Sequence, residues 1–319
     1  MAEVRIPIGT KVPVVREVEP HVYKVAPAKT YTGKKYNKGT EDQVRLRISN
    51  GGAGQSGLIE ALASAYIDWS REYGGVKEDY RIAWITGDTT ESIKYLESGD
   101  ADIAITYNAA AEKRTIALKI AASPSVYGFR DHFYLVGPLN NPAKLTDNDS
   151  VHDMLNKIVT TGDAANTDPP TRFLSRFDKS ATNIKESLLF AEIGQTPWSY
   201  AYSKWYHQYP QYPVPSLKAA SLLKEYTLTD RGTYLTVQAE DKSITDNVKV
   251  YKRGGDTDPN DPLLNPATVL LGTKVDSKNQ ELAQGFMTWI ADKGPNGGQE
   301  VIKGFKKPGT TEYLYTAAP

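Results

Sequence analysis

The chain has 319 residues, and its 39% hydrophobic and 24% charged side chains are typical of a globular protein with one large or two smaller domains. Its 38 basic and 38 acidic side chains give a formal net charge of zero, whereas binding to nucleic acid or membranes through bulk charge needs a basic excess. Cysteine is absent, which excludes disulfides, thiolate metal sites and cysteine nucleophiles, and the four histidines lie far apart in the sequence. We therefore expect no nucleic-acid partner, no metal site and no cofactor.

The first 43 residues contain many proline, lysine and threonine residues without a sustained period, and they predict an extended N-terminal arm, residues 1–43. From residue 44 the pattern is that of an α/β protein. Apolar and polar residues alternate from 44 to 49, as in a strand, and apolar residues recur at helical spacing from 58 to 69. Residues 49–57 between them read Ser-Asn-Gly-Gly-Ala-Gly-Gln-Ser-Gly and predict a Gly-rich loop.

The Gly-rich loop has the chemistry of an anion cradle. Backbone N–H groups at the start of a helix have no partner within the helix, and they lie at the positive end of its dipole. Glycine lets this backbone approach a ligand closely, and the hydroxyls of Ser49 and Ser56 are additional donors. The loop lacks the Lys-Ser/Thr ending of a P-loop, and no acidic residue ends a second strand at the position that a dinucleotide site requires. The alternative is a tight corner of the chain without a ligand.

Two more strand–loop–helix units follow. Their strands are expected at 81–85 and 103–106, their helices end near residues 95 and 119, and another strand is expected at 132–136. Thr89 or Thr90 is the expected N-cap of the first helix, and Asn108 opens the second. Three such units in succession predict a parallel, doubly wound sheet, in which ligands bind beyond the carboxyl ends of the strands. We therefore expect the three loops to meet at one site.

The second half of the chain has a less regular order of elements. Helices are expected at 151–160, 183–194 and 279–292 with a short one after residue 298, and strands at 173–176, 226–228, 233–237 and 268–272. The segment 198–212 holds seven aromatic side chains, which we expect to pack between a helix and the rest of the protein.

Residues 226–235 read Tyr-Thr-Leu-Thr-Asp-Arg-Gly-Thr-Tyr-Leu, and this segment resembles a signature of the tungstate-binding proteins of ABC importers. Other segments resemble the same family in the same order along the chain. They are Gly-Asp-Ala-Asp-Ile at 99–103, Ala-Ala-Ala-Glu at 109–112, Phe-Tyr-Leu-Val-Gly-Pro at 133–138, Leu-Ser-Arg-Phe-Asp-Lys-Ser at 174–180, Leu-Asn-Pro at 264–266, and the pattern of Phe286, Trp289, Gly298, Gln299, Gly304 and Phe305. The joint order of these segments, from residue 44 to 305, identifies the chain as a divergent member of this family.

The resemblance implies an α/β protein with the two-lobed fold of a type II periplasmic binding protein. In this fold, mixed but mostly parallel sheets are flanked by helices, and two crossover strands join the lobes. Lobe one is expected at 44–137 and 267–319, and lobe two at 138–266. The resemblance also implies a ligand between the lobes, an ABC transporter permease as a partner, a monomeric state, and a periplasmic or extracellular location of the mature chain.

The ligand residues that the loops and the resemblance imply come from both lobes. They are Ser49, Asn50, Gly51, Gly52, Ser56, Thr89, Asn108, Ser175, Arg176 and Ser180. Arg176 is the strongest candidate, because its planar guanidinium matches an oxyanion and stays charged at any relevant pH. The family's Thr-Thr-Thr-Ser run is replaced here by Ser-Asn-Gly-Gly-Ala-Gly at 49–54, so the resemblance carries the fold over but leaves the ligand open.

Three classes of function are compatible with the sequence. The first is a solute-binding protein that captures a small oxyanion, such as tungstate or molybdate, between the lobes. The second is a related protein that binds a carboxylate, a sugar or an aromatic acid outside ABC transport, because the Thr-rich loop is missing and the aromatic segment 198–212 is present. An enzyme is third, since there is no cysteine and the histidines have no recognisable carboxylate partner in the sequence, and we assign no catalytic residue.

Overall fold

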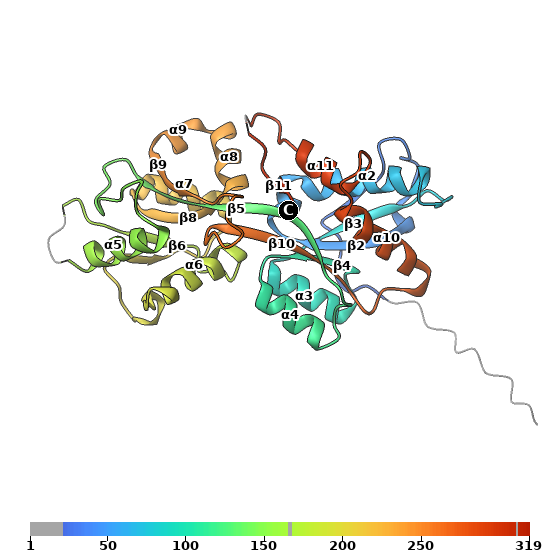
Figure 1. Cartoon of the computed structure of the whole chain (residues 1–319), viewed down its shortest axis with the longest axis horizontal. Helices are drawn as coiled ribbons and strands as arrows, with labels where there is room; N and C mark the ends of the chain where they lie inside the picture. The colour runs from blue at the N-terminus through green and yellow to red at the C-terminus, as the bar shows by residue number, and fades with distance from the viewer. Residues whose placement is uncertain (1–21, 165–167, 311) are drawn as a thin grey trace, which may run out of the picture.

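The computed structural model describes residues 22–164, 168–310 and 312–319, and it has two lobes that lie side by side along its longest axis (Figure 1). The strands are β1 (Lys29–Tyr31), β2 (Val44–Asn50), β3 (Arg81–Thr86), β4 (Ile103–Thr106), β5 (Val126–Pro138), β6 (Phe173–Ser175), β7 (Tyr206–Gln208), β8 (Tyr226–Asp230), β9 (Val248–Arg253), β10 (Leu264–Leu271) and β11 (Thr316–Ala317). The α-helices are α1 (Gly52–Ser56), α2 (Leu58–Glu72), α3 (Thr89–Ser98), α4 (Ala109–Ala117), α5 (Val151–Asp163), α6 (Ala181–Glu192), α7 (Pro213–Leu223), α8 (Arg231–Glu240), α9 (Lys242–Asp246), α10 (Gln280–Ala291) and α11 (Gly298–Gly304). None of the described helices is both long and apolar enough to span a membrane.

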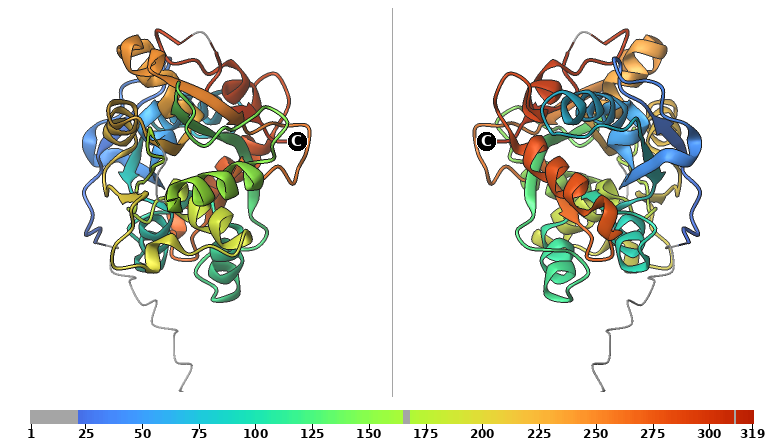
Figure 2. Two further views of the ribbon diagram at one scale, coloured as in Figure 1. Left: turned by 90° about the vertical axis from the view of Figure 1, so that its left-hand side faces the viewer. Right: turned by 90° about the vertical axis from the view of Figure 1, so that its right-hand side faces the viewer.

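Three parallel strands form the centre of the sheet in the first lobe, and β1 and β10 extend it. β2 is parallel to β3 on one side and to β4 on the other, whereas β1 pairs antiparallel with β3 and β10 pairs antiparallel with β4. Helices α2, α10 and α11 pack together on one face, and α3 and α4 lie on the other (Figures 1 and 2). The core between these layers buries side chains such as Leu46, Ile48, Leu62, Phe286 and Trp289. This arrangement agrees with the three predicted strand–loop–helix units.

The second lobe has a smaller sheet with an aromatic core. β8 pairs with β5 and with β6, β6 pairs in parallel with β7, and β9 pairs with β5. The ring of Phe173 lies 5.2 Å from that of Phe190 and 6.3 Å from that of Tyr206. Tyr206 comes from the aromatic segment 198–212, but Tyr202 of the same segment is exposed. The prediction that this segment packs inside the protein is therefore right only in part.

β5 and β10 are the two crossover strands. The first half of β5 pairs antiparallel with β10 and β11, and its second half pairs with β8 and β9 of the second lobe. Within this ladder Asn265 of β10 lies opposite Asp131 of β5. The two strands pass between the lobes (Figure 1). The two-lobed α/β architecture with two crossover strands is therefore confirmed. The expected lobe boundaries, at residues 137 and 266, fall inside these strands and stay a prediction.

Some local predictions differ from the structure. Residues 49–57, expected as a Gly-rich loop, contain the end of β2 and the short helix α1. Residues 233–237, which are rich in β-branched side chains, lie in the helix α8 and not in a strand. The helix is favoured because the carboxylate of Asp230 accepts hydrogen bonds from both the N–H and the hydroxyl of Thr233, at 2.7 and 2.6 Å. Within the expected arm 1–43, residues 1–21 lie outside the described part of the chain, and β1 is an edge strand paired with β3 rather than a free extension.

Gly54 provides a test of the packing beneath the Gly-rich turn. A methyl group at Gly54 would lie 2.0–2.3 Å from atoms of the Trp84 indole, whose Nε1 is held because it donates to the carbonyl of Asn50 at 2.8 Å. Gly54→Ala is therefore expected to lower the free energy of unfolding by about 1–3 kcal/mol, the typical cost of overpacking, in urea denaturation. Gly52→Ala is the control, because no atom lies within 4 Å of its added methyl group. Equal losses in both variants would show that contact with Trp84 is not the cause.

Candidate functional site

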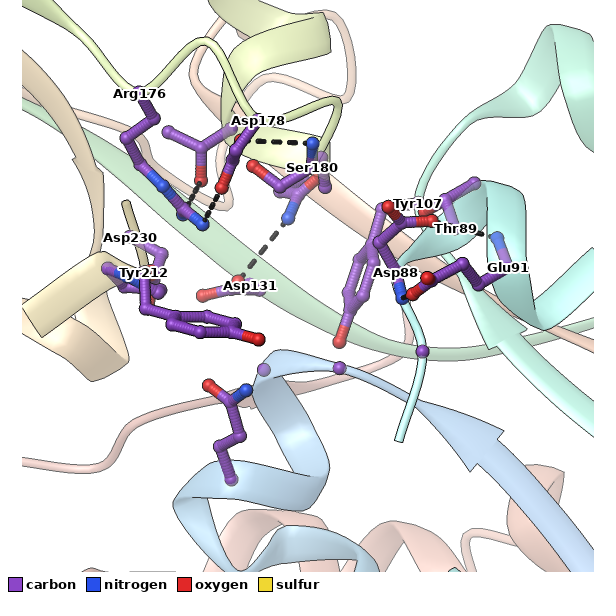
Figure 3. A pocket seen from close by; sticks show the side chains of 18 of the residues that line it. Asp88, Thr89, Glu91, Tyr107, Asp131, Arg176, Asp178, Ser180, Tyr212 and Asp230 are labelled. Atoms are coloured by element: carbon purple, nitrogen blue, oxygen red, sulfur yellow. Dashed lines mark hydrogen bonds and ion pairs between the residues drawn. The ribbon is translucent and has the colours of Figure 1, made fainter. Parts of the chain in front are cut away.

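A cavity of about 470 Å³ lies between the two lobes, at the carboxyl ends of the parallel strands β2, β3 and β4. Its walls come from segments 51–55, 86–91 and 105–107 of the first lobe, from 176–182 and 210–213 of the second, and from Asp131, Phe133, Asp230, Asn265 and Tyr315. Figure 3 shows side chains of both lobes facing this space. The loops after all three parallel strands contribute to the cavity, as the strand–loop–helix pattern predicts.

Five of the ten expected ligand residues line this cavity. They are Gly51, Gly52, Thr89, Arg176 and Ser180. Gly51 is the N-cap of α1 and Gly52 is its first residue, so the N-cap has no side chain to accept a hydrogen bond. Ser180 is the N-cap of α6, where its hydroxyl accepts the N–H of Asn183 at 3.4 Å. Residues from both lobes therefore face one common space.

The other five expected residues support the loops from behind, and Ser49 and Asn50 illustrate how. The hydroxyl of Ser49 lies 2.8 Å from that of Ser92. Asn50 donates its side-chain amide to the carbonyl of Ile105 at 2.8 Å, and its Oδ1 accepts the N–H of Gly54 at 3.0 Å. Both side chains are fully buried, and these bonds hold the first turn of α1 against β4.

Ser56, Asn108 and Ser175 likewise lie outside the cavity wall. The hydroxyl of Ser56 lies 2.8 Å from that of Tyr315, and Asn108 caps α4 by accepting the N–H of Ala111 at 2.9 Å. Ser175 is fully buried in β6. Residues next to these in the chain line the cavity, and because successive side chains of a strand point to opposite faces, sequence position alone does not show which residue faces the cavity.

Arg176 is held by its own lobe while it lines the cavity (Figure 3). Its Nη1 donates to the hydroxyl of Thr182 at 3.1 Å, and its Nε donates to the carbonyl of Gln211 at 3.4 Å. Its Nη2 forms an ion pair with Asp178. These contacts of the described residues use three of the five N–H groups of the guanidinium, which leaves two for a ligand. Since Arg176 is only 6% exposed, hydrogen bonds to it are little weakened by water.

Thr89 has an unused hydroxyl on the cavity wall. The sequence predicts Thr89 or Thr90 as the N-cap of α3, but the cap is Asp88, which accepts the N–H of Glu91 at 2.8 Å. That prediction is wrong because a carboxylate at a helix start gains a charged hydrogen bond and the favourable helix dipole. The hydroxyl of Thr89 is buried and has no hydrogen-bond partner within the described part of the chain. Such a group costs about 1–3 kcal/mol, so we expect a bound ligand to satisfy it.

Five carboxyl groups line the cavity, and the sequence analysis assigns none of them to the site. They are Asp88, Glu91, Asp131, Asp178 and Asp230. Asp88 and Asp230 cap the helices α3 and α8, and Asp178 pairs with Arg176, so each has a partner in the protein. The one sequence pattern that indicates any of these acids is an aspartate directly before a helix, which is typical of an N-cap. Within the described residues, no group of three or more His, Asp and Glu side chains is placed to hold a metal ion.

Asp131 lies on the crossover strand β5, and both of its hydrogen-bond donors are neutral groups. Its Oδ1 accepts the N–H of His132 at 2.8 Å, and its Oδ2 accepts the amide of Asn265 at 3.3 Å. Burial raises the pKa of Asp131 well above its usual value, and the negative charge of Asp230 raises it further. The protonated form of Asp131 is therefore much more favoured than that of a free aspartate.

Two α/β lobes, joined by two crossover strands around a polar cavity, define the architecture of a periplasmic solute-binding protein. The model of the PBP superfamily domain matches residues 37–293, and the chain belongs to this superfamily. A crystal structure described as that of a "periplasmic putative metal binding protein" is 47% identical with a TM-score of 0.81, and the match covers 91% of this chain and 99% of that one.

Two further relatives are named for the anions they bind. The tungstate-binding protein TupA from Desulfovibrio alaskensis G20 is 25% identical with a TM-score of 0.67, over 86% of this chain and 98% of its own. A "Putative ABC transporter anion-binding protein" from Haloferax volcanii is 27% identical over 82% of this chain and 69% of its own length. These similarities confirm the resemblance to tungstate-binding proteins and the type II periplasmic binding fold.

Glu186 of α6 is a buried acid of the second lobe, and its effect on stability can be tested. It is 2% exposed, accepts a hydrogen bond from the hydroxyl of Tyr206 at 2.8 Å, and burial raises its pKa from 4.5 to about 8. The folded state thus keeps a proton that the unfolded state loses above pH 4.5. The free energy of unfolding is therefore expected to fall by up to about 1.4 kcal/mol per pH unit between these two pKa values.

Glu186→Gln mimics the protonated acid, and we expect it to remove this fall when urea denaturation is repeated at a series of pH values. Glu97→Gln is the control, because Glu97 is an exposed residue of α3. It is expected to keep the fall seen in the wild type. If the fall persists in Glu186→Gln, another group is responsible for it.

Proposed function

We propose that this chain is a solute-binding protein whose cavity captures a small oxyanion between the lobes. The proposal rests on one observation, the meeting of donors from both lobes on a single cavity. Arg176 comes from the second lobe, whereas the helix start at Gly51 and Gly52 and the hydroxyl of Thr89 come from the first. An oxyanion between them exchanges its water shell for these donors, and each hydrogen bond that involves a charged group contributes about 1.5–3 kcal/mol.

The donors are held in place before a ligand arrives. At the start of α1, Asn50 accepts the N–H of Gly54 and fixes the turn, and the space next to Gly52 is open, with no atom within 4 Å of the position of a Cβ. Asp178 and Thr182 fix the guanidinium of Arg176. Little conformational entropy is therefore lost on binding, which favours affinity for a small ligand that makes few contacts.

The relatives support a role in transport and an anion of the tungstate type. One structural relative is a tungstate-binding protein, another relative is named for anion binding in an ABC transporter, and a third is periplasmic. We propose that this chain binds tungstate or molybdate as a monomer, in the periplasm or outside the cell, and delivers the anion to an ABC permease. Closure of the lobes about β5 and β10 would enclose the anion.

Thermal unfolding with tungstate, molybdate, sulfate or phosphate tests the proposed ligand class. An anion at 100 times its Kd is expected to add about 2.7 kcal/mol to the free energy of unfolding. Arg176→Gln is expected to weaken the best anion by about 10- to 150-fold in titration calorimetry, because a charged hydrogen-bonded contact of about 1.5–3 kcal/mol is lost.

Arg114→Gln is the matched control, because Arg114 is exposed on α4 and does not line the cavity. Its affinity is expected to equal that of the wild type, so that a loss in Arg176→Gln alone reports on the site. If none of the four anions raises the melting temperature, the oxyanion function is wrong. If an anion binds and Arg176→Gln binds it as tightly as the wild type does, the anion occupies another site.

A second candidate function is the capture of an organic ligand that carries hydrogen-bond donors. Five carboxyl groups line the cavity against the single guanidinium of Arg176, and about 470 Å³ lies within the range of pockets for organic ligands, about 300–1,000 Å³. For this candidate, native mass spectrometry of freshly purified protein is expected to show a retained organic mass. Tight binding of tungstate by protein that never carries such a mass would exclude it.

A further inference from the structure

The carboxyl groups on the cavity wall repel a bound oxyanion when they are charged. A deprotonated anion that binds between Arg176 and the start of α1 enters a space lined by Asp131 and Asp230 as well. Carboxylates only accept hydrogen bonds, so a charged Asp131 and an oxyanion have no proton to share and repel each other.

We propose that the cavity takes up its oxyanion together with one proton, which lies in a hydrogen bond between the carboxyl group of Asp131 and an oxygen of the ligand. The proposal rests on the oxyanion function argued above and names the role of a residue that the sequence analysis missed. With a fully deprotonated anion, the proton comes from solvent and sits on Asp131, which then donates. With an anion that already carries a proton, the ligand donates and Asp131 accepts.

The position of Asp131 supports this role. It lies on the crossover strand β5, is 6% exposed, and forms part of the cavity wall (Figure 3). Each of its oxygens accepts one hydrogen bond from a neutral group, the N–H of His132 on one side and the amide of Asn265 on the other. These donors orient the carboxyl group but do not cancel its charge, and each carboxyl oxygen can take part in a second hydrogen bond.

Charged groups of both signs act on Asp131, and the charge of Arg231 opposes the rise in its pKa that burial and Asp230 cause. Asp230, at the end of β8, and the phenols of Tyr107 and Tyr315 interact with it electrostatically. Arg231 forms an ion pair with Glu312 at 3.3 Å, and Arg176 on the same cavity wall forms one with Asp178. Binding of a proton therefore neutralises Asp131 at the lowest cost in free energy when the oxyanion enters the cavity.

Among Asp131, Asp230, Tyr107 and Tyr315, Asp131 is the group that takes up the proton. Burial raises the pKa of Asp131 well above its usual value. The pKa values of Tyr107 and Tyr315 are raised as well, so both phenols stay protonated and neutral over the physiological range. Asp230 accepts the N–H of Thr233 with one oxygen and the hydroxyl of Thr233 with the other, as the cap of α8.

The affinity for tungstate and sulfate, measured by titration calorimetry from about pH 6 to about pH 10, tests the proposal. Both anions are fully deprotonated across this range. Their affinity is expected to be constant at low pH. At higher pH it is expected to fall about tenfold per pH unit, because binding then requires the uptake of one proton. Hydrogenphosphate keeps its own proton, and its affinity is expected not to fall. Asp131→Asn, whose amide donates without titrating, is expected to bind tungstate with no such fall.

Two further variants make the outcome specific. Glu91→Gln removes another carboxyl of the cavity wall, and it is expected to keep the pH dependence of the wild type, whatever its affinity. Asp230→Asn keeps a helix cap but removes the charge beside Asp131, and the fall in affinity is expected to begin at a lower pH. This second variant also tests the proposal if Asp131→Asn does not fold.

The result separates this inference from the function on which it rests. Tungstate or sulfate binding whose affinity is independent of pH in the wild type overturns the proton alone and leaves the oxyanion function standing. A fall that persists in Asp131→Asn assigns the proton to another group and overturns the role of Asp131. Failure of every anion to bind at every pH overturns both.

Discussion

The pairing of β5 with β10 is the constraint on which the rest of the structure depends. β4 of the first lobe is built on β10, and β8 of the second lobe is built on β5, so one antiparallel ladder places both sheets. The same ladder sets Asn265 opposite Asp131 on the wall of the cavity. Because side chains alternate along a strand, a slip of one residue would turn Asp131 away from the cavity. The loops that carry Gly51 and Arg176 thus face each other only in this register.

Around the cavity, the protein satisfies most of its own helix starts. The side chains of Asp88, Ser180 and Asp230 cap α3, α6 and α8, and Asn50 accepts the N–H of Gly54 in the first turn of α1. The guanidinium of Arg176, which lines the cavity, already pairs with Asp178. A ligand gains from these donors only if its negative oxygens reach them and the rest of it tolerates carboxyl groups. This scarcity of donors favours selectivity over strong binding of anions in general.

The sequence predicts the fold better than the site, for physical reasons. The order of strands and helices follows from hydrophobic period and glycine position, which are local properties of the chain. Exceptions are 49–57, where a short helix lies in the expected loop, and 233–237, where a carboxylate cap before α8 outweighs the propensity of β-branched side chains. In the site, Gly51 lines the cavity while its neighbour Asn50 is buried and bonds the loop from behind. The role of Asp131 depends on Asn265, 134 residues away in the chain, and no local pattern encodes that contact.

β5 exchanges partners at the point where it borders the cavity. His132 is its last residue paired with β10, and Phe133 is its first residue paired with β8. β5 has partner strands on both edges, β10 and β11 before this point and β8 and β9 after it. Any movement between the lobes must therefore deform the strand here. Asp256, from the loop before β10, links this part of β5 to the C-terminal segment. Its Oδ1 lies 2.7 Å from Nε2 of His132 and accepts a hydrogen bond from the hydroxyl of Thr316 at 3.1 Å. Asp131 lines the cavity and lies directly before the point where β5 exchanges β10 for β8, so a ligand that contacts Asp131 would lie next to this point.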